Sequence, residues 1–123
     1  NEPEARLATH NKIDPIESIA LSIKNNITKS DYISVTLGKN GVFSLGKNNS
    51  SVRVPALSLG VVDRVGAGDA YLSLSSLALG SGLTIEEASF IGSIAAAIDV
   101  QIVGNKEYVT DVRLKKYIST LLK

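Results

Sequence analysis

The sequence predicts an α/β fold, and three observations carry that prediction. Three short β-prone runs, at residues 32–37, 42–45 and 51–54, are separated by polar turns, which is the pattern of an antiparallel meander. Residues 61–71 read Val-Val-Asp-Arg-Val-Gly-Ala-Gly-Asp-Ala-Tyr, which indicates a strand, a tight glycine turn and the start of a helix. Apolar residues recur at helical spacing in other segments, most clearly in 16–23 and 114–122. One chain therefore combines strands with several helices.

Composition limits the protein to one modest globular unit. The chain has 123 residues, of which 44% are hydrophobic, so it can bury a real core. Thirteen basic and twelve acidic residues are well mixed, which argues against a nucleic-acid or membrane surface. The absence of cysteine excludes disulfides and thiolate metal sites. No membrane-spanning run or signal peptide is visible, so we expect a cytoplasmic protein. Because the chain begins without methionine, we expect a fragment of a longer protein.

Capping signals mark the helices of the first half. Asn1 and Glu4 are spaced as a capping box, which predicts a short helix at the start of the chain. Residues 14–17, Asp-Pro-Ile-Glu, predict a second helix with Asp14 as its cap. We expect that helix to end at residues 25–26, Asn-Asn, and to serve as scaffold.

The second half predicts three further helices. Residues 70–79 are apolar on nearly all sides, which indicates a buried helix, and the Gly-Ser-Gly at 80–82 ends it. Residues 84–87 form a second capping box, and the alanine-rich body at 88–100 permits close packing. Residues 111–123 have the pattern of an amphipathic terminal helix with a scaffold role.

The glycine turn has the chemistry of an anion site. The amides of Gly66, Ala67 and Gly68 are expected at a helix N-terminus, where free N–H groups favour negative charge. Asp69 follows at the mouth of that site, where a carboxylate could take a proton from an attacking hydroxyl. Together these features suit phosphoryl transfer. A second interpretation stays open, because an Asp in a first helical turn also simply complements the helix dipole.

Three motifs together resemble the PfkB (ribokinase-like) family of sugar kinases. Residues 63–69 resemble the family signature D-T-x-G-A-G-D-x-F, with Arg64 in place of the usual Thr and Tyr71 in place of the usual Phe. The N-x-x-E of residues 1–4 resembles a second family motif, which is linked to phosphates and magnesium. Residues 35–41 resemble the family's V-T-x-G-x-x-G stretch, which lies against the nucleotide.

The resemblance implies that residues 1–123 are the C-terminal, nucleotide-binding part of such a kinase, with a three-layer α/β/α Rossmann-like, ribokinase-like architecture. The whole enzyme would transfer the γ-phosphoryl group of ATP to a sugar or sugar-phosphate hydroxyl. The family builds its sugar pocket and lid upstream of N-x-x-E, so we expect no activity from this chain alone. We also expect an exposed sheet edge or apolar face that promotes self-association.

The resemblance also assigns roles to residues. Asp69 would be the catalytic base, and the amides of Gly66, Ala67 and Gly68 would stabilise the moving phosphoryl group. The remaining residues carried over for the nucleotide and its ions are Asn1, Glu4, Thr36, Gly38, Gly41, Asp63, Ser93 and Gly104. Within this set, Glu4 would help to place Mg²⁺ through water, and Asp63 would contribute to a site for a monovalent cation such as K⁺. Ser93 stands where the family usually has Asn.

Two other functions are compatible with the same sequence. A degenerate nucleotide-binding or regulatory domain would explain Arg64 and Ser93 as signs of drift. A kinase of the same superfold that acts on a nucleoside or a vitamin-type alcohol would carry the same glycine turn. Arg64 would either add positive charge for the phosphates or form an ion pair with Asp63, and we favour the ion pair.

Overall fold

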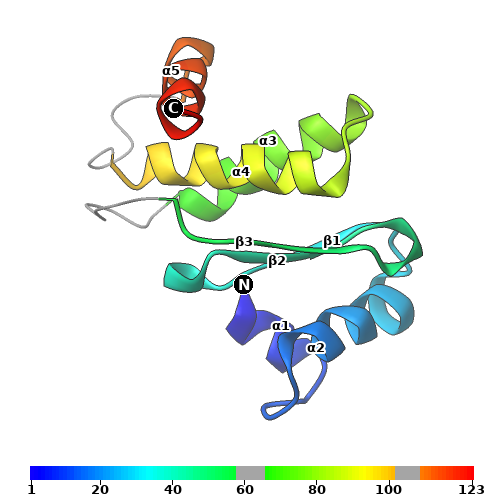
Figure 1. Cartoon of the computed structure of the whole chain (residues 1–123). Coiled ribbons are helices and arrows are strands. Elements are labelled where there is room, and N and C mark those ends of the chain that lie inside the picture. The colour runs from blue at the N-terminus through cyan, green and yellow to red at the C-terminus, as the bar shows by residue number, and fades with distance from the viewer. Residues whose placement is uncertain (58–65, 102–108) are drawn as a thin grey trace.

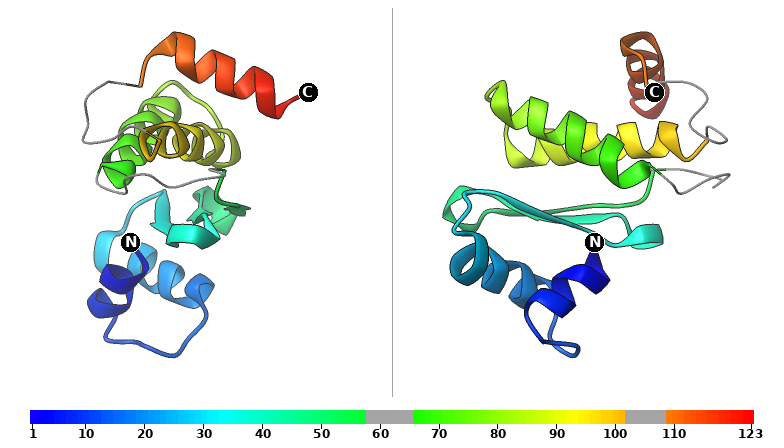
Figure 2. Two further views of the ribbon diagram at one scale, coloured as in Figure 1. Left: turned by 90° about the vertical axis from the view of Figure 1, so that its left-hand side faces the viewer. Right: turned by 180° about the vertical axis from the view of Figure 1, so that it is seen from behind.

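The fold is a small sheet enclosed between two layers of helices. The computed structural model describes residues 1–57, 66–101 and 109–123, so the predictions for Asp63, Arg64 and Gly104 lie outside the described residues. Helices α1 (Glu2–Ala8) and α2 (Ile16–Ser22) cover one face of the sheet, and α3 (Ala67–Gly80) and α4 (Ile85–Asp99) cover the other (Figure 1). Helix α5 (Asp111–Leu121) packs outside α4, and two further views show the same order of layers (Figure 2). The predicted three-layer α/β/α architecture is confirmed.

The sheet is an antiparallel meander in the order β1-β2-β3. Its strands are β1 (Ile33–Thr36), β2 (Val42–Leu45) and β3 (Ser51–Val54). The central strand β2 is buried along its whole length because it has a strand on each side and helices on both faces. The meander was predicted, but the first strand is shorter than the expected 32–37, since the chain turns into a short 3₁₀ helix at Gly38–Asn40.

Alternation along the strands divides the core into two clusters. On the α1 and α2 side, Val35, Phe43 and Leu45 pack with apolar residues of the two helices. On the α3 and α4 side, Val42 and Val54 pack with Tyr71 of α3. The sheet therefore holds both helical layers through opposite faces of the same three strands.

The first capping box is present, but the second predicted cap is wrong. In α1 the Asn1 side chain accepts a hydrogen bond from the Glu4 amide, and the Glu4 side chain returns to the Asn1 backbone. Helix α2 instead starts after Pro15 without a side-chain cap. The Asp14 carboxylate accepts a hydrogen bond of 2.8 Å from the Asn11 side-chain amide, so it is turned away from the helix.

Helix α2 also does not end at residues 25–26 as predicted. The chain continues as a π-helical turn from Ile23 to Thr28 and stops at Lys29, which has a left-handed conformation. Lys24 lies in this turn and is only 8% exposed. Its Nζ donates hydrogen bonds to the carbonyl oxygen of Gly46 at 2.6 Å and to Oδ1 of Asn49 at 3.1 Å. These bonds join the turn to the β2–β3 hairpin, a long-range contact that the local sequence does not reveal.

The helices of the second half follow their sequence signals with one exception. The capping box of α4 is present, and α3 ends at the predicted Gly-Ser-Gly. Helix α3 is not buried on all sides, however, because Leu72 and Leu77 are 62% and 66% exposed. Helix α5 has the expected amphipathic pattern and buries no residue fully.

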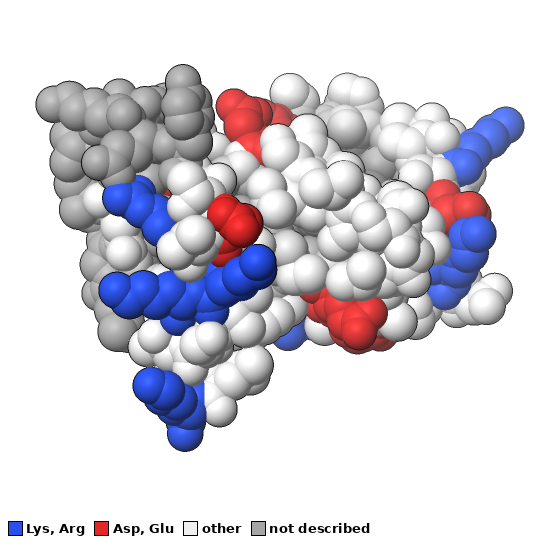
Figure 3. All heavy atoms as spheres, turned by 90° about the horizontal axis from the view of Figure 1, so that it is seen from above, with Lys and Arg blue, Asp and Glu red and all other residues white. Residues whose placement is uncertain are grey.

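Helices α3 and α4 carry few charged side chains. Neither α3 nor α4 contains a Lys or Arg, and the surface above them is largely white in Figure 3. Within the described residues, the outer edges of β1 and β3 have no partner strand. Self-association through these features stays a prediction, which light scattering at high concentration tests. Among the described helices, none has the length and apolar character to cross a membrane.

Candidate functional site

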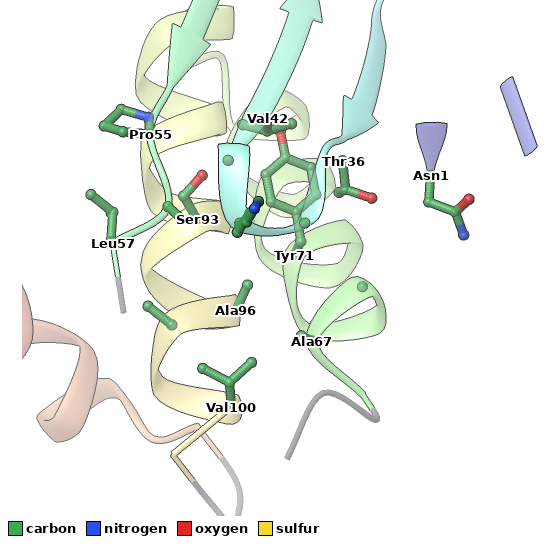
Figure 4. A pocket seen from close by; sticks show the side chains of 16 residues that line it. Asn1, Thr36, Val42, Pro55, Leu57, Ala67, Tyr71, Ser93, Ala96 and Val100 are labelled. Atoms are coloured by element: carbon green, nitrogen blue, oxygen red, sulfur yellow. The ribbon is translucent and has the colours of Figure 1, made fainter. Parts of the chain in front are cut away.

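A cavity of about 440 Å³ lies where the carboxyl end of β1 meets the first turn of α3 and one face of α4 (Figure 4). A volume of this size is typical of small-molecule sites. Its wall brings together residues 36–42, residues 67–71 and residues 93–100, three segments that are far apart in the sequence. The predicted site residues on this wall are Asn1, Thr36, Gly38, Gly41, Ala67, Gly68 and Ser93.

The α4 wall of the cavity is a stripe of small residues that the sequence reasoning missed. Ser93, Ala96, Ala97 and Val100 all line the cavity. Their spacing of three, four and seven residues places them on one face of the helix, and this spacing was the signal that could have identified the stripe. Short side chains on this face leave room for a ligand against the helix. Pro55, Ala56 and Leu57, which follow β3, also line the cavity.

Gly41 is required by the protein's own backbone. It has a positive φ of 83°, and a Cβ there would overlap the carbonyl oxygen of Val54 and crowd the backbone of Pro55. The chain can therefore pass from η2 (Gly38–Asn40) into β2 only with glycine at this position. The resulting close approach keeps the loop beside the end of β3, and Gly41 and Pro55 both line the cavity.

The glycine turn forms the expected helix start. Gly66 has a φ of 98° and is the N-cap residue of α3. The first bond within the helix runs from the Ala70 amide to the Gly66 carbonyl oxygen at 2.9 Å, so the preceding amides make no bond inside the helix. No side chain of the described residues caps this end. The amides of Ala67, Gly68 and Asp69 are thus placed at the positive end of the helix dipole.

Asp69 opens onto a second hollow of about 480 Å³. The lining of this hollow includes Asp69 and Glu4, together with Ser34 of β1 and Leu72 of α3. Asp69 is exposed, in agreement with its predicted place at the mouth of the site. The cavity and this hollow share four residues, which are Asn1, Thr36, Gly68 and Tyr71. The two spaces therefore meet at the glycine turn.

Glu4 lies at the rim of the second hollow. Its position is set by the capping box of α1, in which the Glu4 amide donates to Oδ1 of Asn1 at 3.1 Å. Within the described residues, no three acidic, histidine or cysteine side chains cluster as a metal cage. Mg²⁺ in nucleotide sites needs only one or two carboxylates, with phosphates and water completing the shell. Glu4, which lines the hollow, supplies one such carboxylate.

The structure thus places most of the predicted residues around one point. Ala67 and Gly68 lie with Thr36, Gly38, Gly41 and Ser93 in the cavity, and Glu4 and Asp69 lie in the hollow beside it. Gly66 does not line the cavity itself, but it is the N-cap residue of α3 and directly precedes Ala67, which does. Tyr71 lines both spaces and its ring lies between Thr36 and Ser93 in Figure 4, although the sequence reasoning gave it no role beyond its departure from Phe.

Comparison with known proteins identifies the family. Residues 1–110 match the sequence profile described as pfkB family carbohydrate kinase. The chain belongs to this family. It is also 33% identical over 106 residues to the bifunctional protein HldE of Syntrophotalea carbinolica, with 85% of this chain and 22% of that protein covered. The match to the PfkB family confirms the resemblance that the three motifs indicated.

Solved structures of PfkB-type kinases have the same fold. Phosphofructokinase-2 from Escherichia coli, in complex with potassium, superposes with a TM-score of 0.85 at 20% identity, covering 100% of this chain and 40% of that one. Arabidopsis thaliana ribokinase, complexed with ribose and ATP, superposes with a TM-score of 0.82 at 22% identity, covering 96% of this chain and 39% of that one. The chain therefore spans about two fifths of these structures and less than a quarter of HldE.

Proposed function

We propose that this chain is the nucleotide-binding part of an ATP-dependent sugar kinase, and that the whole enzyme transfers the γ-phosphoryl group of ATP to a sugar or sugar-phosphate hydroxyl. The observation that supports this most is the meeting of the cavity and the second hollow at Gly68. A nucleotide in the cavity would present its terminal phosphate to the α3 turn. An acceptor in the hollow would approach the same phosphate beside Asp69.

In the proposed reaction, Asp69 accepts the proton of the acceptor hydroxyl. The acceptor oxygen forms a bond to the γ-phosphorus as the bond from that phosphorus to the bridging oxygen of ADP breaks, so ADP leaves with the electron pair. The amides of Gly66, Ala67 and Gly68 donate to the oxygens of the transferring group. Charge stabilisation and alignment of this kind supply most of the catalysis in phosphoryl transfer.

The nucleotide and its ions are assigned to the surrounding residues. Thr36, Gly38 and Gly41 would contact the nucleotide from the β1 side, and Ser93 would contact it from α4. Asn1 and Glu4 would hold Mg²⁺ through water, and the metal would neutralise phosphate charge. A monovalent cation such as K⁺ would be held near Asp63 and Gly104, and both of these assignments lie outside the described residues.

The acceptor side needs more protein than this chain contains. The lining of the second hollow offers Glu4, Asp69 and several serine hydroxyls. The side chains of Glu4, Asp69 and Leu72 on this lining are all exposed, so the hollow does not enclose a sugar. We therefore propose that the rest of a longer kinase encloses the sugar and that this chain alone binds nucleotide without transferring phosphate. We also propose a cytoplasmic enzyme, in keeping with its nucleotide and sugar substrates.

Two matched substitutions test the nucleotide site. Calorimetric titration of this chain with ATP and Mg²⁺ should show binding, and Ser93→Leu should weaken it at least about tenfold because the larger side chain occupies the cavity. Ser73→Leu is the control, since Ser73 is exposed on α3 and lines neither space. Equal affinity of Ser93→Leu and Ser73→Leu would place the nucleotide elsewhere.

The catalytic role of Asp69 is tested in a complete kinase that carries this sequence. Asp69→Asn should abolish phosphate transfer and leave ATP affinity within about twofold, because Asp69 opens onto the hollow and not onto the nucleotide cavity. Transfer by the unchanged complete protein would exclude the degenerate regulatory alternative. Binding without any transfer would favour it. Transfer by the 123-residue chain that is lost in Asp69→Asn would overturn the proposal that this part is inactive alone.

A further inference from the structure

Tyr71 is tied to the sheet through its hydroxyl group. The side chain is only 5% exposed, and its hydroxyl donates to Oγ of Ser34 at 3.1 Å. It also lies 3.4 Å from Oγ of Ser44, which is itself 2.8 Å from Oγ of Ser34. Oγ of Ser89 in α4 donates to Oγ of Ser44 at 2.8 Å. A network of four hydroxyl groups therefore connects α3 and α4 to strands β1 and β2.

The ring of Tyr71 is fixed as firmly as its hydroxyl. A Cβ built on Gly92 would lie 2.9 Å from both Cδ2 and Cε2 of the ring and 3.0 Å from Cβ of Ser75. The ring therefore rests directly on the backbone of α4, where only glycine leaves room. On its other side the ring packs with Val42 and Val54 of the sheet. Tyr71 is consequently held from α4, β1 and β2 at once.

This anchor lies one helical turn from the anion-binding amides. In an α-helix the amide of residue 71 bonds to the carbonyl of residue 67, and its side chain leans back over the preceding turn. A constraint on Tyr71 is therefore a constraint on the turn that carries Gly68 and Asp69. The same side chain lines both the cavity and the hollow, so it lies beside the two groups that those spaces would receive.

We propose that Tyr71 is a positioning residue, whose hydroxyl network and seat on Gly92 fix the first turn of α3 relative to Thr36 at the end of β1. This inference rests on the proposed function, because the turn is where the nucleotide phosphates would bind. Tyr71 acts through the backbone of residues 67–69 and makes no contact with the reacting atoms. The tyrosine hydroxyl, which phenylalanine lacks, is the group that carries this role.

Amide hydrogen exchange tests, without any ligand, whether Tyr71 orders the first turn of α3. The amide of Ala70 makes the first intrahelical bond of α3, to Gly66, and the amide of Leu114 makes the equivalent bond of α5, to Thr110, both at 2.9 Å. In Tyr71→Phe, exchange at Ala70 should accelerate about tenfold, as expected for the loss of roughly one hydrogen bond, while exchange at Leu114 stays unchanged. Equal acceleration at both amides would show a merely global loss of stability and overturn the proposal.

Tyr117→Phe is the matched control for removing a tyrosine hydroxyl. The hydroxyl of Tyr117 donates to the carbonyl oxygen of Leu57 at 2.8 Å, a bond that joins α5 to the chain after β3. This variant should lose comparable stability and leave exchange at Ala70 unchanged. A double-mutant cycle of Tyr71→Phe with Ser34→Ala should be non-additive, because both changes remove the same bond. Additive effects at Ala70 would contradict the network.

Nucleotide affinity then separates this inference from the proposed function. At a temperature where both proteins are folded, Tyr71→Phe should raise the dissociation constant for ATP with Mg²⁺ about tenfold. If the unchanged chain binds ATP and Tyr71→Phe binds it equally well, the positioning role fails while the nucleotide site stands. If the unchanged chain binds no ATP, the proposed function fails, and the exchange at Ala70 still decides whether Tyr71 orders the turn.

Discussion

Because Gly92 contacts Tyr71, we expect Gly92→Ala to destabilise the protein, although helix propensity alone predicts that the change stabilises it. Gly92 lies inside α4, where replacing glycine by alanine normally stabilises a protein by about 1 kcal/mol. Here the new Cβ would lie 2.9 Å from two ring carbons of Tyr71, closer than such atoms can approach. The ring cannot retreat easily because its hydroxyl is bonded to Ser34 of β1.

The structure therefore predicts a net loss of stability for Gly92→Ala. Overpacking of a filled core costs about 1–3 kcal/mol, and the rigid ring places this site toward the upper end. After the gain in helix propensity is subtracted, the free energy of unfolding should fall by about 1–2 kcal/mol. Thermal unfolding followed by circular dichroism should show a midpoint lowered by roughly 4–8 °C for a chain of this size.

Gly80→Ala is the matched control for this change. Gly80 is the last residue of α3, and a Cβ there would meet no atom within 4 Å. The same substitution should therefore be neutral or stabilise the protein by less than about 1 kcal/mol. If Gly92→Ala were as stable as Gly80→Ala, the ring would have room to move, and the argument that Tyr71 is rigidly seated would be refuted.

Two further predictions concern groups outside the site. Lys24→Met keeps an unbranched side chain, one atom shorter, but removes the buried donor to the carbonyl oxygen of Gly46. Urea unfolding should therefore show a loss of about 1–3 kcal/mol, whereas Lys12→Met, at an exposed position, should change little. The guanidinium of Arg53 donates to the Glu17 carboxylate at 2.6 Å and lowers the pKa of that carboxyl. Because the pKa is lowered, the ionised Glu17 carboxylate stabilises the fold at pH values above its ordinary pKa, and this contribution is lost below the lowered pKa. Glu17→Gln should therefore reduce the free energy of unfolding by less than about 1 kcal/mol at neutral pH and leave it unchanged in strong acid. A loss for Glu17→Gln that persisted in acid would show that packing, not the ion pair, is responsible.

Helix starts were predicted well from the sequence where the interacting residues all lie within one short segment. The capping boxes at Asn1 and Thr84 formed as expected, because each needs only residues three positions apart. Asp14 failed as a cap because the amide of Asn11 competes for its carboxylate. The π-helical turn was missed because Lys24 bonds to a hairpin more than twenty residues away.

In the candidate site, too, local motifs were predicted from the sequence and long-range contacts were not. Motif spacing predicted Thr36, Gly68 and Asp69 as site residues, since turns and helix starts carry their own sequence signals, and all three line the second hollow. The stripe of small residues on α4 was missed because an alanine side chain has no functional group that marks it as part of a site. The role of Tyr71 could not be predicted, because its hydroxyl partners lie on strands far away in the sequence.

A titration of this chain with ATP, with and without Mg²⁺, followed by backbone amide NMR, tests most directly whether the chain carries the nucleotide site. We expect coordinated shifts in two separate groups, residues 66–69 at the α3 turn and residues 36–41 at the end of β1. Shifts in both groups that saturate at the same ATP concentration would support one nucleotide site formed by both segments. Shifts in neither group, or in only one of them, would contradict the claim that this chain carries that site.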